Sequence, residues 1–188
     1  PFTLPGYPEV PILSNRLIDD EPVGVISAGD FWHTDLSFGE VPCRATFLYA
    51  LEVAREGGDT EWSNIHTAYD ALSDDTKEKI AELRCIHVFD RRRNRRTKVD
   101  TQFVDKADEV YGVSLPDAVH PMVRHHPDTG RKSLYISPRF VVGIEGGDDD
   151  EAQHLLDELF EHQIRPEFRY RHRRRRGDLL MWDNPSLI

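Results

Sequence analysis

A histidine and an aspartate stand two positions apart in residues 31–35, which read Phe-Trp-His-Thr-Asp. On an extended strand, side chains two positions apart point to the same face. His33 and Asp35 would then direct an imidazole and a carboxylate towards one point. Such a pair supplies two of the three protein ligands of a mononuclear non-haem iron centre. The pair alone also fits a structural histidine beside an acidic turn, so its meaning depends on the rest of the chain.

Two further segments each begin with glycine and place polar residues near a tryptophan. Residues 57–62 read Gly-Gly-Asp-Thr-Glu-Trp, and Thr60 follows His33 by 27 positions. Residues 177–184 read Gly-Asp-Leu-Leu-Met-Trp-Asp-Asn. Taken singly, Thr60 fits a β-branched strand residue, and Trp182 fits a residue of an apolar core.

The elements that position these residues are predicted to be mostly short strands. Alternation and branched or aromatic residues predict strands at 10–13, 45–51, 60–62, 86–89, 120–124, 133–136, 168–172 and 178–183. One helix is predicted near 66–83, with Ser73 as an N-cap inside it, and a second helix near 152–160, with one apolar stripe. Residues 90–119 are polar and are predicted to hold no regular element. This pattern favours an antiparallel β-sandwich or jelly roll with flanking helices.

Composition limits the compartment and the partners. The chain has 188 residues, 38% of them hydrophobic, and a formal net charge of −10, which disfavours a nucleic-acid-binding surface. No apolar stretch approaches the roughly 20 residues of a membrane span. Cys43 and Cys85 form no CxxC pair. One disulfide is possible, but two free thiols in a reducing cytoplasm are favoured.

Taken in order, the three segments resemble the taurine / 2,4-dichlorophenoxyacetate dioxygenase family of Fe(II)- and α-ketoglutarate-dependent oxygenases. The resemblance runs from about His33 to Ile188. It implies a mainly β fold with flanking helices, a double-stranded β-helix (jelly roll, cupin-like). Residues 1–188 would form a single catalytic domain that lacks its N-terminal and C-terminal segments. Family members are commonly dimers or tetramers, so a homo-oligomer is expected.

The resemblance also assigns roles to individual residues. His33 and Asp35 would bind iron, Thr60 would hydrogen-bond a carboxylate of α-ketoglutarate (2-oxoglutarate), and the residues lining that pocket would be Leu51 and Trp182. In the family, Trp-Asp-Asn is followed by the second iron-binding His and then by an Arg that grips the ketoacid. Both are expected just beyond Ile188. The implied substrate contacts are Arg93, Phe140 and Leu36.

The activity that the resemblance implies is oxidation of a small, anionic organic molecule by O₂, by hydroxylation or oxidative cleavage, with release of succinate and CO₂. The implied partner is therefore a small-molecule substrate, not a nucleic acid or a membrane. Two alternatives stay open: a related oxygenase that ends in desaturation or rearrangement, and a non-catalytic jelly-roll module that binds a small molecule. Of the remaining histidines, His125 and His126 lie beside a turn and are predicted to be solvent-exposed.

Overall fold

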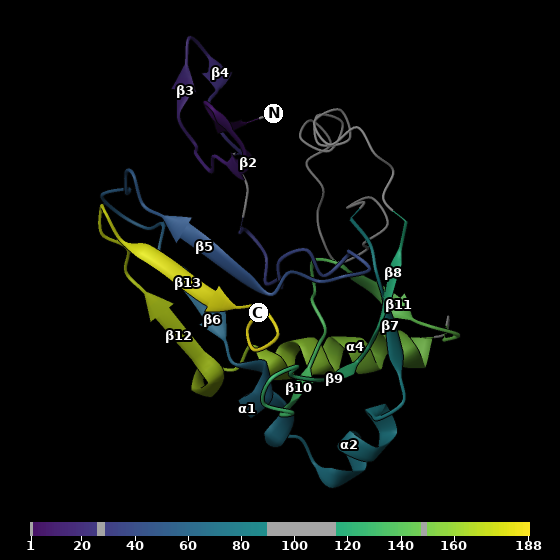
Figure 1. The fold of residues 1–188 in the computed structure, drawn as a ribbon. Helices are drawn as coiled ribbons and strands as arrows, with labels where there is room; N and C mark the ends of the chain where they lie inside the picture. The colour runs from purple at the N-terminus through teal and green to yellow at the C-terminus, as the bar shows by residue number, and fades with distance from the viewer. Residues whose placement is uncertain (1, 26–28, 90–115, 148–149) are drawn as a thin grey trace.

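The computed structural model of the chain describes residues 2–25, 29–89, 116–147 and 150–188. Within these ranges the chain consists mainly of short antiparallel strands with a few helices beside them (Figure 1). The described helices are α1 (Ile65–Asp70), α2 (Asp74–Ile80) and α4 (Asp150–Gln163), and a 3-10 turn, η2 (Pro166–Phe168), follows α4. The strands are β1 (Thr3–Leu4), β2 (Tyr7–Pro11), β3 (Leu17–Ile18), β4 (Glu21–Pro22), β5 (Ala45–Tyr49), β6 (Thr60–Ser63), β7 (Arg84–His87), β8 (Ala118–Pro121), β9 (Val123–His125), β10 (Lys132–Leu134), β11 (Val141–Ile144), β12 (Arg169–His172) and β13 (Leu179–Asp183).

The first four strands form two small hairpins, β1 with β2 and β3 with β4. Figure 1 shows them in purple, apart from the layer that holds the helices. Their large apolar side chains, such as Leu17 and Ile18, are largely exposed, so they add nothing to the hydrophobic core of the described chain.

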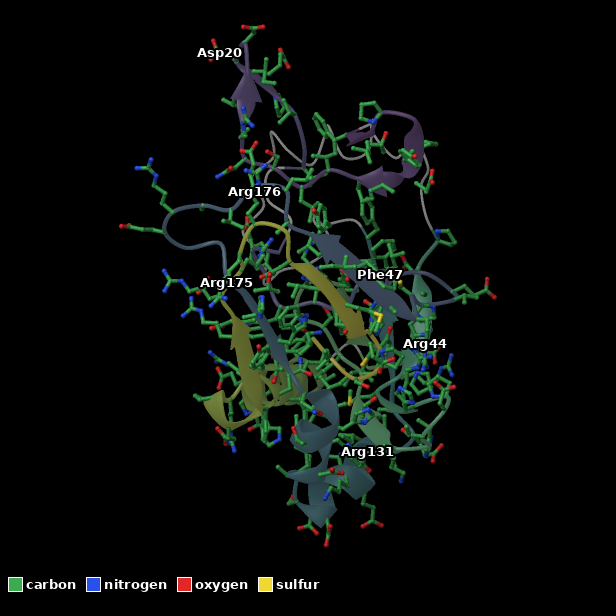
Figure 2. The ribbon with its side chains drawn as sticks, turned by 60° about the vertical axis from the view of Figure 1, so that its left-hand side comes forward. Asp20, Arg44, Phe47, Arg131, Arg175 and Arg176 are labelled. Atoms are coloured by element: carbon green, nitrogen blue, oxygen red, sulfur yellow. The ribbon has the colours of Figure 1, made fainter. Side chains whose placement is uncertain are left out.

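Two antiparallel strand pairs bring distant parts of the chain together. In the β5–β13 pair, Thr46 lies opposite Trp182, and in the β6–β12 pair, Thr60 lies opposite His172. The outer face of the β5–β13 pair is apolar and exposed, as at Phe47, which is labelled in Figure 2. The strands predicted at 45–51, 60–62, 168–172 and 178–183 are therefore confirmed, although β5 ends at Tyr49.

The core lies between α4 and the three-stranded sheet in the order β11-β7-β8. The apolar stripe predicted for α4 is confirmed, because Leu155, Leu156, Leu159 and Phe160 are all buried in one cluster. Cys85 on β7 belongs to the same cluster, and both cysteines are free thiols.

The single helix predicted near 66–83 is wrong, since the chain forms two short helices there. The first ends at Asp70, and Ser73 then caps the second by accepting a hydrogen bond from the backbone N–H of Thr76 at 3.1 Å. Ser73 itself has an extended backbone, with φ −64° and ψ 156°, so it cannot continue the first helix, while its side chain caps the second.

The polar segment predicted to lack regular structure is only partly described. Residues 90–115 lie outside the described ranges, and Ala118 and Val119, at the end of the predicted segment, belong to β8. Among the described residues, no helix is long and apolar enough to cross a membrane.

Truncation of Leu156 to Ala is expected to destabilise the fold by about 3 kcal/mol, through lost burial and a cavity. Leu156 is fully buried in the core between α4 and β11. The same truncation at the exposed Leu17 is the matched control, with little effect expected. Urea unfolding of both variants measures the difference, and equal free energies of unfolding would contradict the core described here.

Candidate metal centre

His33 and Asp35 face each other directly. The Nε2 atom of His33 lies 3.2 Å from Oδ1 of Asp35, and both side chains are roughly three-quarters buried. The Nδ1 atom of His33 lies 2.6 Å from the carbonyl oxygen of Phe31, which can only accept a hydrogen bond. Nδ1 therefore bears a proton, and Nε2 is the nitrogen turned towards the carboxylate.

The local backbone is not the extended strand that the two-residue spacing suggested. His33 lies in an irregular segment, and Asp35 opens a turn in which Leu36 has a φ of 53°. A positive φ is uncommon for a branched residue. The turn is held by the Thr34 hydroxyl, which donates to the carbonyl of Leu187 at 3.0 Å. The extended geometry assumed for the pair is therefore absent, while the predicted convergence of the two side chains is present.

The second oxygen of the Asp35 carboxylate is held by the β5–β13 pair. The Thr46 hydroxyl donates to Oδ2 at 2.6 Å, and the indole of Trp182 also hydrogen-bonds the carboxylate. Thr46 in turn accepts a hydrogen bond from the side-chain amide of Asn184 at 2.8 Å. Oδ1 is thus the oxygen left to face His33.

Hydrogen bonding outweighs burial in setting the charge of this pair. Burial lowers the pKa of His33, but the hydrogen bonds to Asp35 and to the Phe31 carbonyl more than compensate, so the pKa is raised. Burial raises the pKa of Asp35, but the hydrogen bonds from His33 and Thr46 lower it below its ordinary value. Both shifts act in the same sense, because each favours the charged form of its group.

Aromatic rings cover one side of His33. The ring of Phe140 meets the imidazole edge-on, with 5.9 Å between ring centroids, and Phe38 packs against Phe140 at 4.9 Å. The guanidinium of Arg139 lies 4.7 Å from the centre of the Phe140 ring and is 6% exposed. Its positive charge opposes protonation of His33, which places it within electrostatic range of the pair.

The residues predicted to bind the ketoacid differ in burial and in the contacts that they make. The hydroxyl oxygen of Thr60 is buried and has no hydrogen-bond partner among the described residues. Trp182 packs on Trp62, with 5.4 Å between rings, and reaches Asp35. Leu51 follows the end of β5 and is 60% exposed, so its place in that pocket stays a prediction.

Phe140, a predicted substrate contact, packs against His33. Leu36 follows Asp35 directly, but its side chain is largely exposed. Arg93 lies outside the described residues. The roles assigned to all three therefore stay predictions.

The prediction of an exposed His126 is wrong, whereas His125 is exposed as expected. The Nδ1 atom of His126 accepts hydrogen bonds from the backbone N–H groups of Asp128 and Thr129, both at 3.2 Å. Its Nε2–H therefore donates to Oδ2 of Asp183 at 2.9 Å. The turn fixes the neutral tautomer and buries the ring against the end of β13.

Sequence reasoning missed the roles of Thr46, which lies in none of the three segments, and of Asn184, which was noted only as the end of the Trp-Asp-Asn segment. It also missed Arg139, which adjoins Phe140. Within the described ranges, no group of three His, Cys, Asp or Glu side chains is arranged to hold a metal ion. His33 and Asp35, the two predicted ligands, are thus oriented by neighbours of other residue types.

Comparison with known proteins gives a consistent answer. The family model described as "Taurine catabolism dioxygenase TauD, TfdA family" matches residues 2–188. An α-ketoglutarate-dependent 2,4-dichlorophenoxyacetate dioxygenase of Cupriavidus pinatubonensis is 37% identical over 97% of this chain and 63% of its own length. A protein of the same name from a Burkholderia species is 35% identical over 97% of this chain and 61% of its own length. The chain thus spans less than two thirds of these curated relatives.

Solved structures agree with the sequence matches. The crystal structure of AAD-2 in complex with Mn(II) and N-oxalylglycine superposes with a TM-score of 0.72 at 35% identity, covering 85% of this chain and 56% of that protein.

The metal-free pair should make stability depend on pH in a defined direction. Because the pKa of His33 is raised, its contribution is complete below the ordinary value of 6.5 and is lost as pH rises through the folded-state pKa. Because the pKa of Asp35 is lowered, its contribution is present above the ordinary value of 3.8 and is lost only as pH falls through the folded-state pKa. Stabilisation by the pair is therefore greatest between these two ordinary values.

Urea unfolding of the metal-free chain at about pH 5.5 and about pH 8.5 tests this linkage. The wild type should lose more stability between the two pH values than Asp35→Asn, which removes the partner of His33. The interpretation is wrong if both proteins lose the same free energy.

Proposed function

Because the chain belongs to the TauD/TfdA family of dioxygenases, we propose that it is an Fe(II)- and α-ketoglutarate-dependent dioxygenase. The observation on which this rests is the opposition of Nε2 of His33 and Oδ1 of Asp35, 3.2 Å apart, in a partly buried setting. An imidazole and a carboxylate are two members of the facial ligand set that binds non-haem Fe(II). The fold proposed with this function is the double-stranded β-helix, supported by the mainly β structure and the TM-score of 0.72 to a solved relative.

The environment of each ligand suits metal binding. The Phe31 carbonyl holds Nδ1–H of His33, which leaves Nε2 for the metal and fixes the ring plane. The Thr46 hydroxyl holds Oδ2 of Asp35, which leaves Oδ1 for the metal. The proton shared between Nε2 and Oδ1 would leave when metal binds, since metal ligands must be deprotonated. When bound, Fe(II) and α-ketoglutarate supply the oxidising chemistry with O₂ and release succinate and CO₂.

The buried hydroxyl of Thr60 fits a carboxylate of the ketoacid. A buried hydroxyl without a partner costs free energy, and a carboxylate oxygen would satisfy it with a charge-assisted hydrogen bond. This is the role proposed for Thr60. Trp182 supports the proposed pocket by packing on Trp62, which lies two residues after Thr60 on β6.

The proposed substrate is a small organic anion with an apolar portion. The rings of Phe38 and Phe140 provide an apolar wall next to His33. The nearly buried guanidinium of Arg139 provides positive charge on the same side. Both 2,4-dichlorophenoxyacetate dioxygenases act on a carboxylate by name, which supports the same class of substrate.

The cytoplasm is the proposed location, supported by the two free thiols, Cys43 and Cys85. The proposal of one catalytic domain is supported by the family match, which extends over residues 2–188.

Iron-dependent formation of succinate from α-ketoglutarate under air tests the function. Turnover is expected with Fe(II) and should be abolished in His33→Ala and in Asp35→Ala. His154→Ala is the matched control, because His154 is exposed on α4 and pairs only with Glu158 one turn away among the contacts seen for it. Binding of α-ketoglutarate without iron-dependent succinate would instead favour the non-catalytic module.

Loss of the Thr60 hydroxyl should weaken ketoacid binding selectively. Thr60→Val is expected to raise the KM for α-ketoglutarate by about 10-fold or more, the worth of a hydrogen bond to a charged group. Thr67→Val, which alters an exposed threonine of α1, should leave this KM unchanged. An unaltered KM in Thr60→Val would remove Thr60 from the proposed site.

The substrate class can be tested with matched pairs of compounds. Carboxylates, sulfonates and sulfate esters should stimulate succinate formation, whereas the amide or alcohol of the same carbon skeleton should stimulate it less. The difference should shrink in Arg139→Gln. Equal stimulation by charged and neutral members of each pair would contradict the proposal of an anionic substrate.

A further inference from the structure

We propose that Thr46 and Asn184 form a hydrogen-bond relay that positions the carboxylate of Asp35, so that only Oδ1 is presented to the metal. Neither residue is proposed as a ligand of the metal, so both are positioning residues. This inference rests on the proposed function, because it concerns how the iron site is prepared.

The direction of the relay follows from the donors and acceptors. The carboxylate of Asp35 can only accept, so the single proton of the Thr46 hydroxyl must lie in the 2.6 Å contact with Oδ2. The Thr46 oxygen is then free to accept, and the Asn184 amide nitrogen donates to it at 2.8 Å. If the amide were reversed, two acceptors would compete for one hydroxyl proton.

Burial makes this arrangement costly to break. Asn184 is 1% exposed, and its amide oxygen has no hydrogen-bond partner among the described residues. A buried amide oxygen without a hydrogen-bond partner costs folding free energy, so a contribution to stability alone does not explain Asn184. Its bond to Thr46 is therefore the feature of Asn184 that points to the site.

Strand register brings the relay to Asp35. Thr46 lies opposite Trp182 in the β5–β13 pair, and the backbone N–H of Asn184 donates to the carbonyl of Arg44 at 3.1 Å. The side chains of Trp182 and Asn184 both act on Asp35, one directly and one through Thr46. The end of β13 thus acts on the carboxylate by two routes.

Asp183, between these two residues, anchors the segment on its other side. Its carboxylate accepts the Nε2–H of His126 at 2.9 Å and the hydroxyl proton of Ser186. The neutral tautomer of His126 is set by the turn after β9, so this anchor does not depend on the metal site. The backbone that presents Trp182 and Asn184 is therefore fixed before any metal binds.

The consequence for metal binding is preorganisation. Without the Thr46 hydroxyl, the Asp35 carboxylate could turn about its side-chain torsions, and the metal would have to order it on binding. Partners that orient a ligand in this way are typically worth 10- to 100-fold in metal affinity. A hydroxyl at position 46 is what matters, not the shape of the side chain.

The test is a titration of the 188-residue chain with Mn(II) alone, followed by the EPR signal of the free ion. Thr46→Val, which keeps the shape and removes the hydroxyl, should bind Mn(II) roughly 10-fold or more weakly than wild type. Thr46→Ser, which restores the hydroxyl, should bind within about 3-fold of wild type. Thermal unfolding of the metal-free proteins separates this effect from a general loss of fold.

The variant Asn184→Ala, alone and combined with Thr46→Val, tests whether Asn184 and Thr46 act as one unit. The single variant should weaken Mn(II) binding less than Thr46→Val, since the hydroxyl remains but is no longer directed. The double variant should bind no more weakly than Thr46→Val alone, because residues in one hydrogen-bond network are not additive. If the fold losses of Mn(II) affinity in the two single variants multiplied in the double variant, the relay would be overturned.

The outcomes separate the inference from the proposed function. If the wild type binds Mn(II) and Thr46→Val binds it equally well, the relay is wrong and the metal site stands. Wild type that binds Mn(II) no better than Asp35→Ala would contradict the metal site itself, and the relay with it. Failure of Thr46→Ser to recover affinity would also overturn the relay.

Discussion

The hydrogen bond from Thr46 to Asp35 is the contact on which the arrangement of the site depends. It joins the turn after His33 to β5, and β5 is joined to β13 along its whole length. Segments near residues 35, 46 and 184 meet there, although they are far apart in the chain. A carboxylate that is three-quarters buried needs such donors, because burial without hydrogen bonds would favour its neutral form.

The charge state of the metal-free pair follows from the same balance. Burial acts against both charges, and the hydrogen bonds act in their favour. Where the pair is charged, the imidazolium would have to lose a proton before His33 could bind the proposed metal. Affinity for a metal ion should consequently increase as pH rises through the pKa of His33. The stabilisation by the pair and the proposed affinity for metal thus have opposite dependences on pH in this range.

Local patterns in the sequence predicted many of the helices and strands. The contacts between these elements could not be predicted from local patterns. The stripe of α4 and the strand character of β5 and β13 are visible in short windows, and so is the pair His33 and Asp35. The turn around Leu36 was not predicted, because its positive φ depends on tertiary contacts and not on its residue type. The dimer or tetramer, and a third ligand with an arginine beyond Ile188, stay predictions.

The part played by Thr46 and Asn184 could not be inferred from one sequence, because they meet only when β5 and β13 adopt one register. His126 was misjudged for a similar reason, since the end of β13 is what covers it.

The Trp-Asp-Asn segment then acquires a physical explanation. Successive side chains of a strand alternate between its faces. Trp182 and Asn184 act on Asp35 from one face, while Asp183 is anchored from the other. Trp182 and Asn184 thus hold the carboxylate of Asp35, while Asp183 between them fixes the segment that presents both side chains.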